Sequence, residues 1–197
     1  MNRKLRETIL QLAKRDAVVR ERLAADGALF EGYHPEMQAV HEQNAAILAG
    51  ILETHGWPGM SLVGKDGSEA AWIVAQHAIG LPDFQRRCLV LIEEAAKRGE
   101  APAWQPAYLG DRIRTFEGRP QIYGTQFDWD DQGLMSPLPI EDPDGVDARR
   151  ATIGLPPLAE TTRNHRLQSE REPRTADHEA RRKEMRDWAV KVGWRPA

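Results

Sequence analysis

A histidine set in an otherwise apolar helical stretch is the first residue of this chain whose type suggests chemistry. His77 follows the apolar run 70–75, and it shares one side of the expected helix with Trp72 and Gln76. An imidazole gives and takes protons near neutral pH. We therefore predict that His77 acts as an acid or a base.

A second polar group follows further along the chain. Tyr108, Asp111 and Arg112 lie three and four positions apart, which places them on one helix face. An arginine grips a carboxylate or a phosphate with two hydrogen bonds, so Arg112 is a candidate for binding an anion. The predicted catalytic residues are His77, Asp111 and Tyr123, and the predicted substrate-binding residues are Arg112, Tyr108, Gln126, Gln121, Trp57 and Trp72. The prediction includes no metal ligand and leaves the cofactor open.

The same residues also fit a structural alternative. Buried polar groups must find hydrogen-bond partners whether or not they do chemistry. The group could therefore be a buried network that ties a β-hairpin to the helices, and the sequence leaves the site and the network both open.

Two motif-like stretches do not make the sites they resemble. Residues 59–65 have the spacing of a phosphate-binding loop, but Asp66 stands where a hydroxyl should hold magnesium. Residues 128–133 resemble the start of a calcium loop, but Pro139 takes the place of the bidentate glutamate. We predict a hairpin turn at 128–133 instead.

The spacing of the six histidines and the presence of a single cysteine give weak support to a metal site. Seven positions separate His34 from His41, about 10.5 Å along a helix, which is too far for one shared ion. A metal site built from His55, His77 and Asp111 stays open as an alternative that requires these side chains to converge. The chain has one cysteine, so it forms no internal disulfide.

Hydrophobic periodicity predicts the elements that must position these residues. An irregular loop is expected over 56–67, where glycines and a proline interrupt the helical period. Helices are expected over 3–25, 35–54, 68–79, 80–98, 102–116, 146–153 and 176–192. Another starts near 155 and fades into a linker or loose helix over 163–175. Strands are expected over 121–129 and 134–140. The fold class is therefore mainly α, a compact helical domain with one β-hairpin packed on it.

Charge divides the 197 residues into a body and a tail. Residues 1–162 carry a net charge of -7 and residues 163–197 carry +4, for a total of -3. We predict a domain over 1–162, with its hairpin near 121–140, and a charged extension over 163–197 that ends in a helix and docks on acidic surface. The body has no basic face for nucleic acid, and no run of about 18 apolar residues could span a membrane. A charged N-terminus without a signal-peptide core predicts a cytoplasmic protein.

Five motifs together resemble a bacterial domain family of unknown function. They are GWPG-x-SLVG, AAW-x-x-x-QHA, YL-x-DR, PQ-x-YGTQ and RR-x-x-x-GLPPL, at 56–64, 70–78, 108–112, 120–126 and 149–158. The resemblance covers about residues 40–160. It implies that a shared core or site contains Trp57, His77, Asp111, Arg112, Tyr123 and Gln126.

Three hypotheses for function follow. The first is an enzyme without metal or cofactor that uses His77 for acid–base chemistry on a small anionic substrate held by Arg112, with a possible place in specialised biosynthesis. The second is a non-catalytic binding module that meets a protein partner or a second copy through the C-terminal extension. The third is a metal-assisted hydrolase or oxygenase that uses His55, His77 and Asp111.

Overall fold

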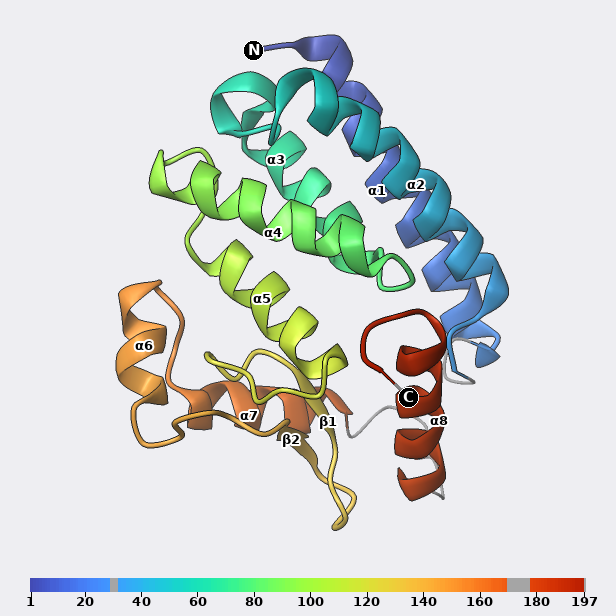
Figure 1. The fold of residues 1–197 in the computed structure, drawn as a ribbon, viewed down its shortest axis with the longest axis vertical. Coiled ribbons are helices and arrows are strands. Elements are labelled where there is room, and N and C mark those ends of the chain that lie inside the picture. Colours follow the sequence, from blue (N-terminus) through green and yellow to red (C-terminus); the bar gives the residue numbers. More distant parts are fainter. Residues whose placement is uncertain (29–31, 170–177, 197) are drawn as a thin grey trace. The chain divides into compact units, whose positions relative to one another are not determined.

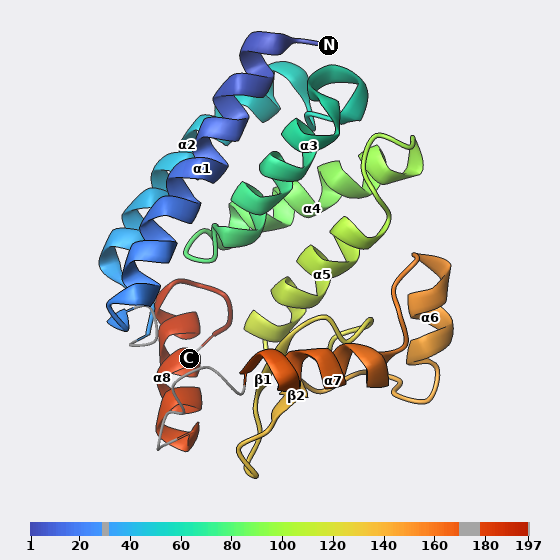
Figure 2. The same cartoon turned by 180° about the vertical axis from the view of Figure 1, so that it is seen from behind.

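Eight helices and one short hairpin make up the computed structural model, which describes residues 1–28, 32–169 and 178–196 (Figure 1; seen from behind in Figure 2). The helices are α1 (Arg3–Ala25), α2 (Pro35–His55), α3 (Met60–His77), α4 (Pro82–Lys97), α5 (Trp104–Phe116), α6 (Val146–Thr152), α7 (Leu158–Ser169) and α8 (His178–Lys191). The strands are β1 (Phe127–Trp129) and β2 (Met135–Pro137). The predicted fold class, mainly α with one β-hairpin, is confirmed. None of the described helices is long and apolar enough to cross a membrane.

Residue contacts divide the chain into two compact units, Met1–Pro106 and Ala107–Ala197, and the boundary falls inside α5. The first unit contains α1 to α4, and the second contains the hairpin and α6 to α8. We describe each unit by itself. The predicted division into 1–162 and 163–197 stays a prediction.

In the first unit, α1 and α2 run antiparallel side by side, as both views show, and α1 also packs on α3. The buried side of α1 repeats every three to four residues, as the apolar stripe predicts. The fully buried apolar side chains include Ile9 of α1, Leu48 of α2, Val74 of α3 and Ile92 of α4. This shared core fixes the inward faces of the helices.

The irregular loop predicted over 56–67 is wrong for residues 60–67, because α3 begins at Met60. Glycine-rich composition suggested a loop, but tertiary contacts hold these residues in helical turns. Gly64 has φ +78°, a left-handed conformation that glycine adopts without strain, and it kinks the helix. The Glu100 carboxylate accepts a hydrogen bond from the Ser61 N–H at 2.8 Å. A carboxylate thus sits at the helix start where a phosphate-binding loop would place its anion.

In the second unit, the hairpin is shorter than predicted. β1 and β2 pair antiparallel, with Phe127 opposite Pro137 and Trp129 opposite Met135. Of the remaining residues in the predicted strands, Gln121 makes an isolated bridge to Ile140. Residues 122–126 take no strand structure, because two buried charged side chains bind their backbone, as described below.

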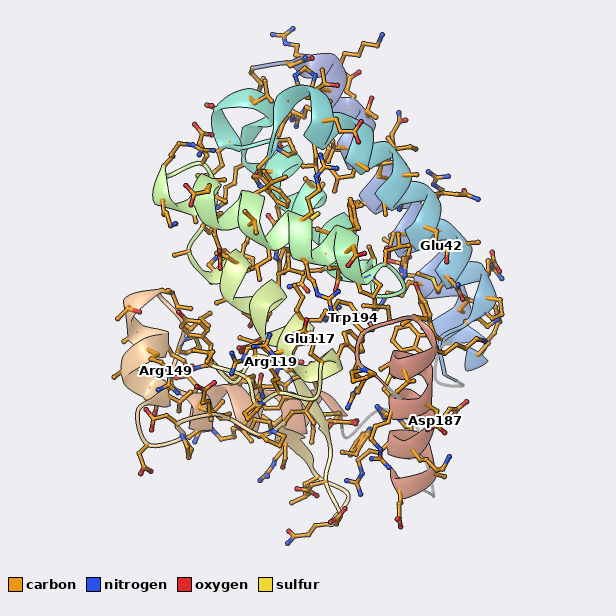
Figure 3. The ribbon with its side chains drawn as sticks, in the orientation of Figure 1. Glu42, Glu117, Arg119, Arg149, Asp187 and Trp194 are labelled. Carbon is orange, nitrogen blue, oxygen red and sulfur yellow. The ribbon has the colours of Figure 1, made fainter. Side chains whose placement is uncertain are left out.

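The C-terminal helix α8 belongs to the second unit, where it contacts the acidic hairpin. Arg181 pairs with Asp128, and Arg182 pairs with Asp131. Trp194, labelled in Figure 3 after α8, is 2% exposed and stacks on Phe116 with ring centroids 5.2 Å apart. The basic tail therefore docks on acidic surface within its own unit, as its charge predicts.

The segment before α8 is predicted as a linker or a loose helix over 163–175. Residues 163–169 are helical and continue α7, in which His165 stacks on Phe127. Residues 170–175 lie outside the described residues.

Candidate functional site

Three helices of the first unit bring a carboxylate and two imidazoles together. Asp16 comes from the middle of α1, His41 from the first half of α2, and His77 from the last turn of α3. Asp16 is 2% exposed and His41 is also buried, whereas the His77 side chain keeps 25% of its surface exposed. We call these three residues the Asp–His–His cluster. His77 is its most accessible member.

One carboxylate oxygen joins the cluster. Asp16 Oδ2 lies 2.8 Å from His77 Nδ1 in a hydrogen bond. The same oxygen lies 3.1 Å from His41 Nε2, within ion-pair distance, although this nitrogen makes no hydrogen bond. The two imidazole rings are 5.4 Å apart. The Asp16 carboxylate therefore fixes the His77 ring firmly and attracts the His41 ring without satisfying its nitrogen.

A tyrosine completes the surroundings of His41. The Tyr33 hydroxyl, just before α2, lies 2.8 Å from His41 Nδ1, on the opposite side of the ring from Asp16. Burial raises the pKa of Tyr33, and the negative charges of Glu42 and Asp16 raise it further. The hydroxyl therefore stays protonated and is able to donate to His41 or to accept from it.

Asp16 is held as an ionised carboxylate. Burial alone raises the pKa of Asp16, but its contacts with His41 and His77 outweigh burial and hold the pKa well below its ordinary value. An ionised carboxylate between two imidazoles is able to orient a proton-carrying histidine or to bind a cation. Both kinds of chemistry use the same three atoms.

The Asp–His–His cluster is also the group that could hold a metal ion among the described residues. One donor atom from each member lies within 4.8 Å of a donor atom of each other member. The grouping predicted as an alternative, His55 with His77 and Asp111, takes its residues from both units and stays a prediction. His55 ends α2, fourteen positions after His41, which is about 21 Å along the helix axis.

Asp111, a predicted catalytic residue, binds backbone in the second unit. It is 1% exposed, and its oxygens accept hydrogen bonds from the N–H groups of Ile122, Tyr123 and Thr125 at 2.7–3.2 Å. The Thr125 hydroxyl donates to it as well, at 3.1 Å. These contacts hold the segment 122–125 in place. Both carboxylate oxygens of Asp111 accept hydrogen bonds from it.

Arg150 binds the same segment from its carbonyl side, and sequence reasoning missed it. Arg150 is 1% exposed, and it donates to the carbonyls of Tyr123 and Gly124 at 2.7 and 3.3 Å. It also donates to the Pro156 carbonyl and to the Thr161 hydroxyl. The preceding residue Arg149, labelled in Figure 3, reaches the Ile122 carbonyl. We call 122–125 the clamped loop, because Asp111 and Arg150 bind it on opposite sides.

The predicted substrate-binding glutamines belong to the same network. Gln121 donates to the carbonyls of Gln126 and Leu138, and its own side-chain oxygen accepts from the Gln126 N–H. Arg112 donates to the Gln126 side chain at 3.2 Å. The Gln126 amide also contacts the Tyr108 carbonyl at 3.5 Å. Hydrogen bonds thus connect six of the predicted residues, of which Asp111 and Gln121 are buried and the others half-buried: Tyr108, Asp111, Arg112, Gln121, Tyr123 and Gln126. The site and the structural network both stay predictions.

The two predicted tryptophans lie in the first unit with His77. Trp57 is buried, and Trp72 donates to the Gln105 carbonyl at 3.1 Å while its ring meets Trp104 edge to face. The structure therefore places Trp57, Trp72 and His77 in one unit and the remaining six predicted residues in the other.

A pattern on two helices could have revealed the missed members of the cluster. Asp16 stands four positions after Leu12, on the stripe of buried residues of α1. His41 stands four positions after Met37 on the buried stripe of α2. A charged or titratable residue in an apolar stripe is unusual, because burial without a partner is costly. Two such interruptions on neighbouring helices indicate a shared polar site.

Comparison with known proteins gives one finding about family. The sequence model of a family described as "Family of unknown function (DUF6624)" matches residues 3–168. No curated protein and no solved structure matches the chain. The resemblance to a family of unknown function is confirmed. The match extends beyond the expected 40–160 at both ends, so it includes Asp16 as well as His41 and His77.

Proposed function

We propose a function from the Asp–His–His cluster, because the family to which the chain belongs, DUF6624, has no known function. The proposal is an enzyme that transfers a proton to or from a small substrate at Asp16, His41 and His77. The observation that carries it is a buried carboxylate bonded at 2.8 Å to a histidine whose side chain is still one-quarter exposed.

Each member of the cluster has a distinct part. His77 is the member that a substrate can reach, because Asp16 and His41 are buried. The hydrogen bond from His77 Nδ1 to Asp16 fixes the orientation of the ring, as a carboxylate does for a catalytic histidine. His41 contacts the same carboxylate oxygen, and Tyr33 contacts the other nitrogen of the His41 ring.

The charge of the substrate is a separate prediction, which depends on Arg112. Arg112 lies in the other unit, where it donates to Gln126. The proposal therefore concerns the type of reaction at the Asp–His–His cluster. A bacterial source, a cytoplasmic location and a place in specialised biosynthesis remain expectations that accompany the proposal.

A turnover screen with matched variants tests the proposal. The wild-type chain, His77→Gln and Asp16→Asn are assayed against a panel of small carboxylate esters, amides and phosphate esters, with circular dichroism to confirm folding. His55→Gln is the control, because His55 lies at the far end of α2 from the cluster. We expect turnover by the wild type and the control, and loss of at least about 100-fold in both cluster variants.

Turnover that survives in folded His77→Gln would refute the proposal. A panel without any substrate, together with saturable binding of a panel member, would instead favour the binding-module hypothesis.

A further inference from the structure

We infer that Asp16, His41 and His77 bind one divalent transition-metal ion through Asp16 Oδ2, His41 Nε2 and His77 Nδ1. The inference rests on the proposed function, because it concerns the same cluster and names the cofactor whose bound water would exchange the proton. The metal site predicted from His55, His77 and Asp111 involved a different set of residues.

The donor set selects the class of metal. Two imidazole nitrogens and one carboxylate oxygen suit zinc, ferrous iron, cobalt and nickel. Calcium and magnesium take six or more oxygen ligands, which this cluster does not offer. We therefore expect a first-row transition metal rather than an alkaline-earth ion.

The distances fit a site that needs little movement to close around an ion. Ligand bonds of about 2.0–2.2 Å in tetrahedral geometry place donor atoms about 3.3 Å apart. The distances from Asp16 Oδ2 to His77 Nδ1 and His41 Nε2 are 2.8 and 3.1 Å. These two pairs must therefore separate by a few tenths of an ångström, and the donor atoms of His41 and His77 lie within 4.8 Å of each other. The partly exposed His77 ring is the member that has room to make this adjustment.

His41 Nε2, which makes no hydrogen bond, points to a ligand. His41 Nε2 is buried without a hydrogen bond, although it faces the Asp16 carboxylate. A buried polar atom without a partner costs free energy. An ion between His41 Nε2 and Asp16 Oδ2 would satisfy the nitrogen lone pair and the carboxylate together.

The Tyr33 hydroxyl supplies the support that metal-binding histidines need. A ligating histidine usually donates its other N–H to a neighbouring oxygen, which fixes the tautomer and the ring orientation. The Tyr33 oxygen lies 2.8 Å from His41 Nδ1 and is able to accept that hydrogen bond. Tyr33 is therefore a positioning residue that leaves the lone pair of His41 Nε2 free for the metal.

The number of protein ligands is that of a catalytic site. Structural zinc sites close all four positions with protein ligands, whereas catalytic sites use three and leave the fourth to water. The cluster offers three donors, of which the two on Asp16 and His41 are buried and the third is partly exposed. Water bound to such an ion loses a proton near neutral pH, which fits the proposed proton transfer.

Cobalt titration of the untagged full-length chain tests the inference. The chain is first stripped with EDTA, and Co²⁺ binding is followed by the visible absorption of the ion, with zinc added afterwards as a competitor. We expect one Co²⁺ per chain in the wild type, displacement by zinc, and no absorption band with Asp16→Ala, His41→Ala or His77→Ala. His55→Ala, on the same helix as His41, is the matched control and should bind like the wild type.

Tyr33→Phe adds a readout that a purely structural role would not change. It keeps all three ligands and the ring, so the cobalt band should persist while affinity falls by about 10- to 100-fold. Circular dichroism of each metal-free variant separates lost binding from lost folding.

The possible outcomes separate this inference from the proposed function. Wild-type protein that binds no Co²⁺ or Zn²⁺, or folded His41→Ala that binds as tightly as wild type, overturns the metal site and leaves proton transfer by His77 intact. If the wild-type chain binds metal but His77→Gln keeps its turnover, the proposed function is refuted and the metal site stands.

Discussion

Replacing Asp111 tests whether this residue holds the clamped loop. Asp111→Ala removes the acceptor of three backbone N–H groups and of the Thr125 hydroxyl. A buried donor left without a partner costs about 1–3 kcal/mol, so the four donors set an upper range of about 4–12 kcal/mol. Water entry and loop relaxation reduce that figure. We expect a loss of about 3–5 kcal/mol in the free energy of unfolding, as when one member of a buried charged network is removed.

Urea unfolding of the full chain, followed by circular dichroism, measures this loss by linear extrapolation. Asp111→Asn keeps one acceptor oxygen but turns an NH₂ group toward a donor, so we expect an intermediate loss of about 2 kcal/mol. Asp144→Ala is the control, because Asp144 is an exposed acid in the same unit, and its stability should stay within about 0.5 kcal/mol of wild type. A loss below about 1 kcal/mol for Asp111→Ala would show that the loop does not depend on the carboxylate, and a catalytic role for Asp111 would regain support.

Three further predictions concern packing and reactivity. Trp194→Ala should lower the free energy of unfolding by about 3–5 kcal/mol in urea melts, because Trp194 is buried on Phe116; an unchanged midpoint would contradict that packing. The Cys88 thiol should react with a thiol reagent at pH 8 only after denaturation, because burial raises its pKa to about 12. Gly124→Ala should destabilise by at least about 1 kcal/mol by thermal melting, since φ there is +66° and a Cβ would lie 2.9 Å from Leu158.

Helix positions followed from the sequence because periodicity reports burial directly. The stripe that begins Leu5, Ile9, Leu12 predicts α1, and Pro35 at the first turn of α2 marks its start. Periodicity did not predict that α3 begins at Met60, where the Glu100 side chain binds the backbone of the first turn. Such a contact joins positions far apart in the sequence, and local composition does not record it.

The candidate site was predicted in part for the same reason. His77 stood out because an apolar run leads to it, and the structure places it beside Asp16. Asp16 and His41 were missed because the apolar residues alone predict α1 and α2, and these two polar residues lie within the same stripes. Conversely, Asp111 was predicted to be catalytic because helical spacing places it on one face with Tyr108 and Arg112. Helical spacing does not show that the backbone of 122–125 binds Asp111 on that face.

The clamped loop has a consequence for how the second unit folds. Asp111 and Arg150 stand 39 positions apart, and each loses water when it is buried. Asp111 gains its backbone donors, and Arg150 gains the Tyr123 and Gly124 carbonyls in addition to Pro156 and Thr161, only when residues 122–125 arrive. Closing a chain segment of this length costs entropy before any contact repays it. The two charges and the loop should therefore assemble in one cooperative step, and this step should form the kinetic barrier of the unit.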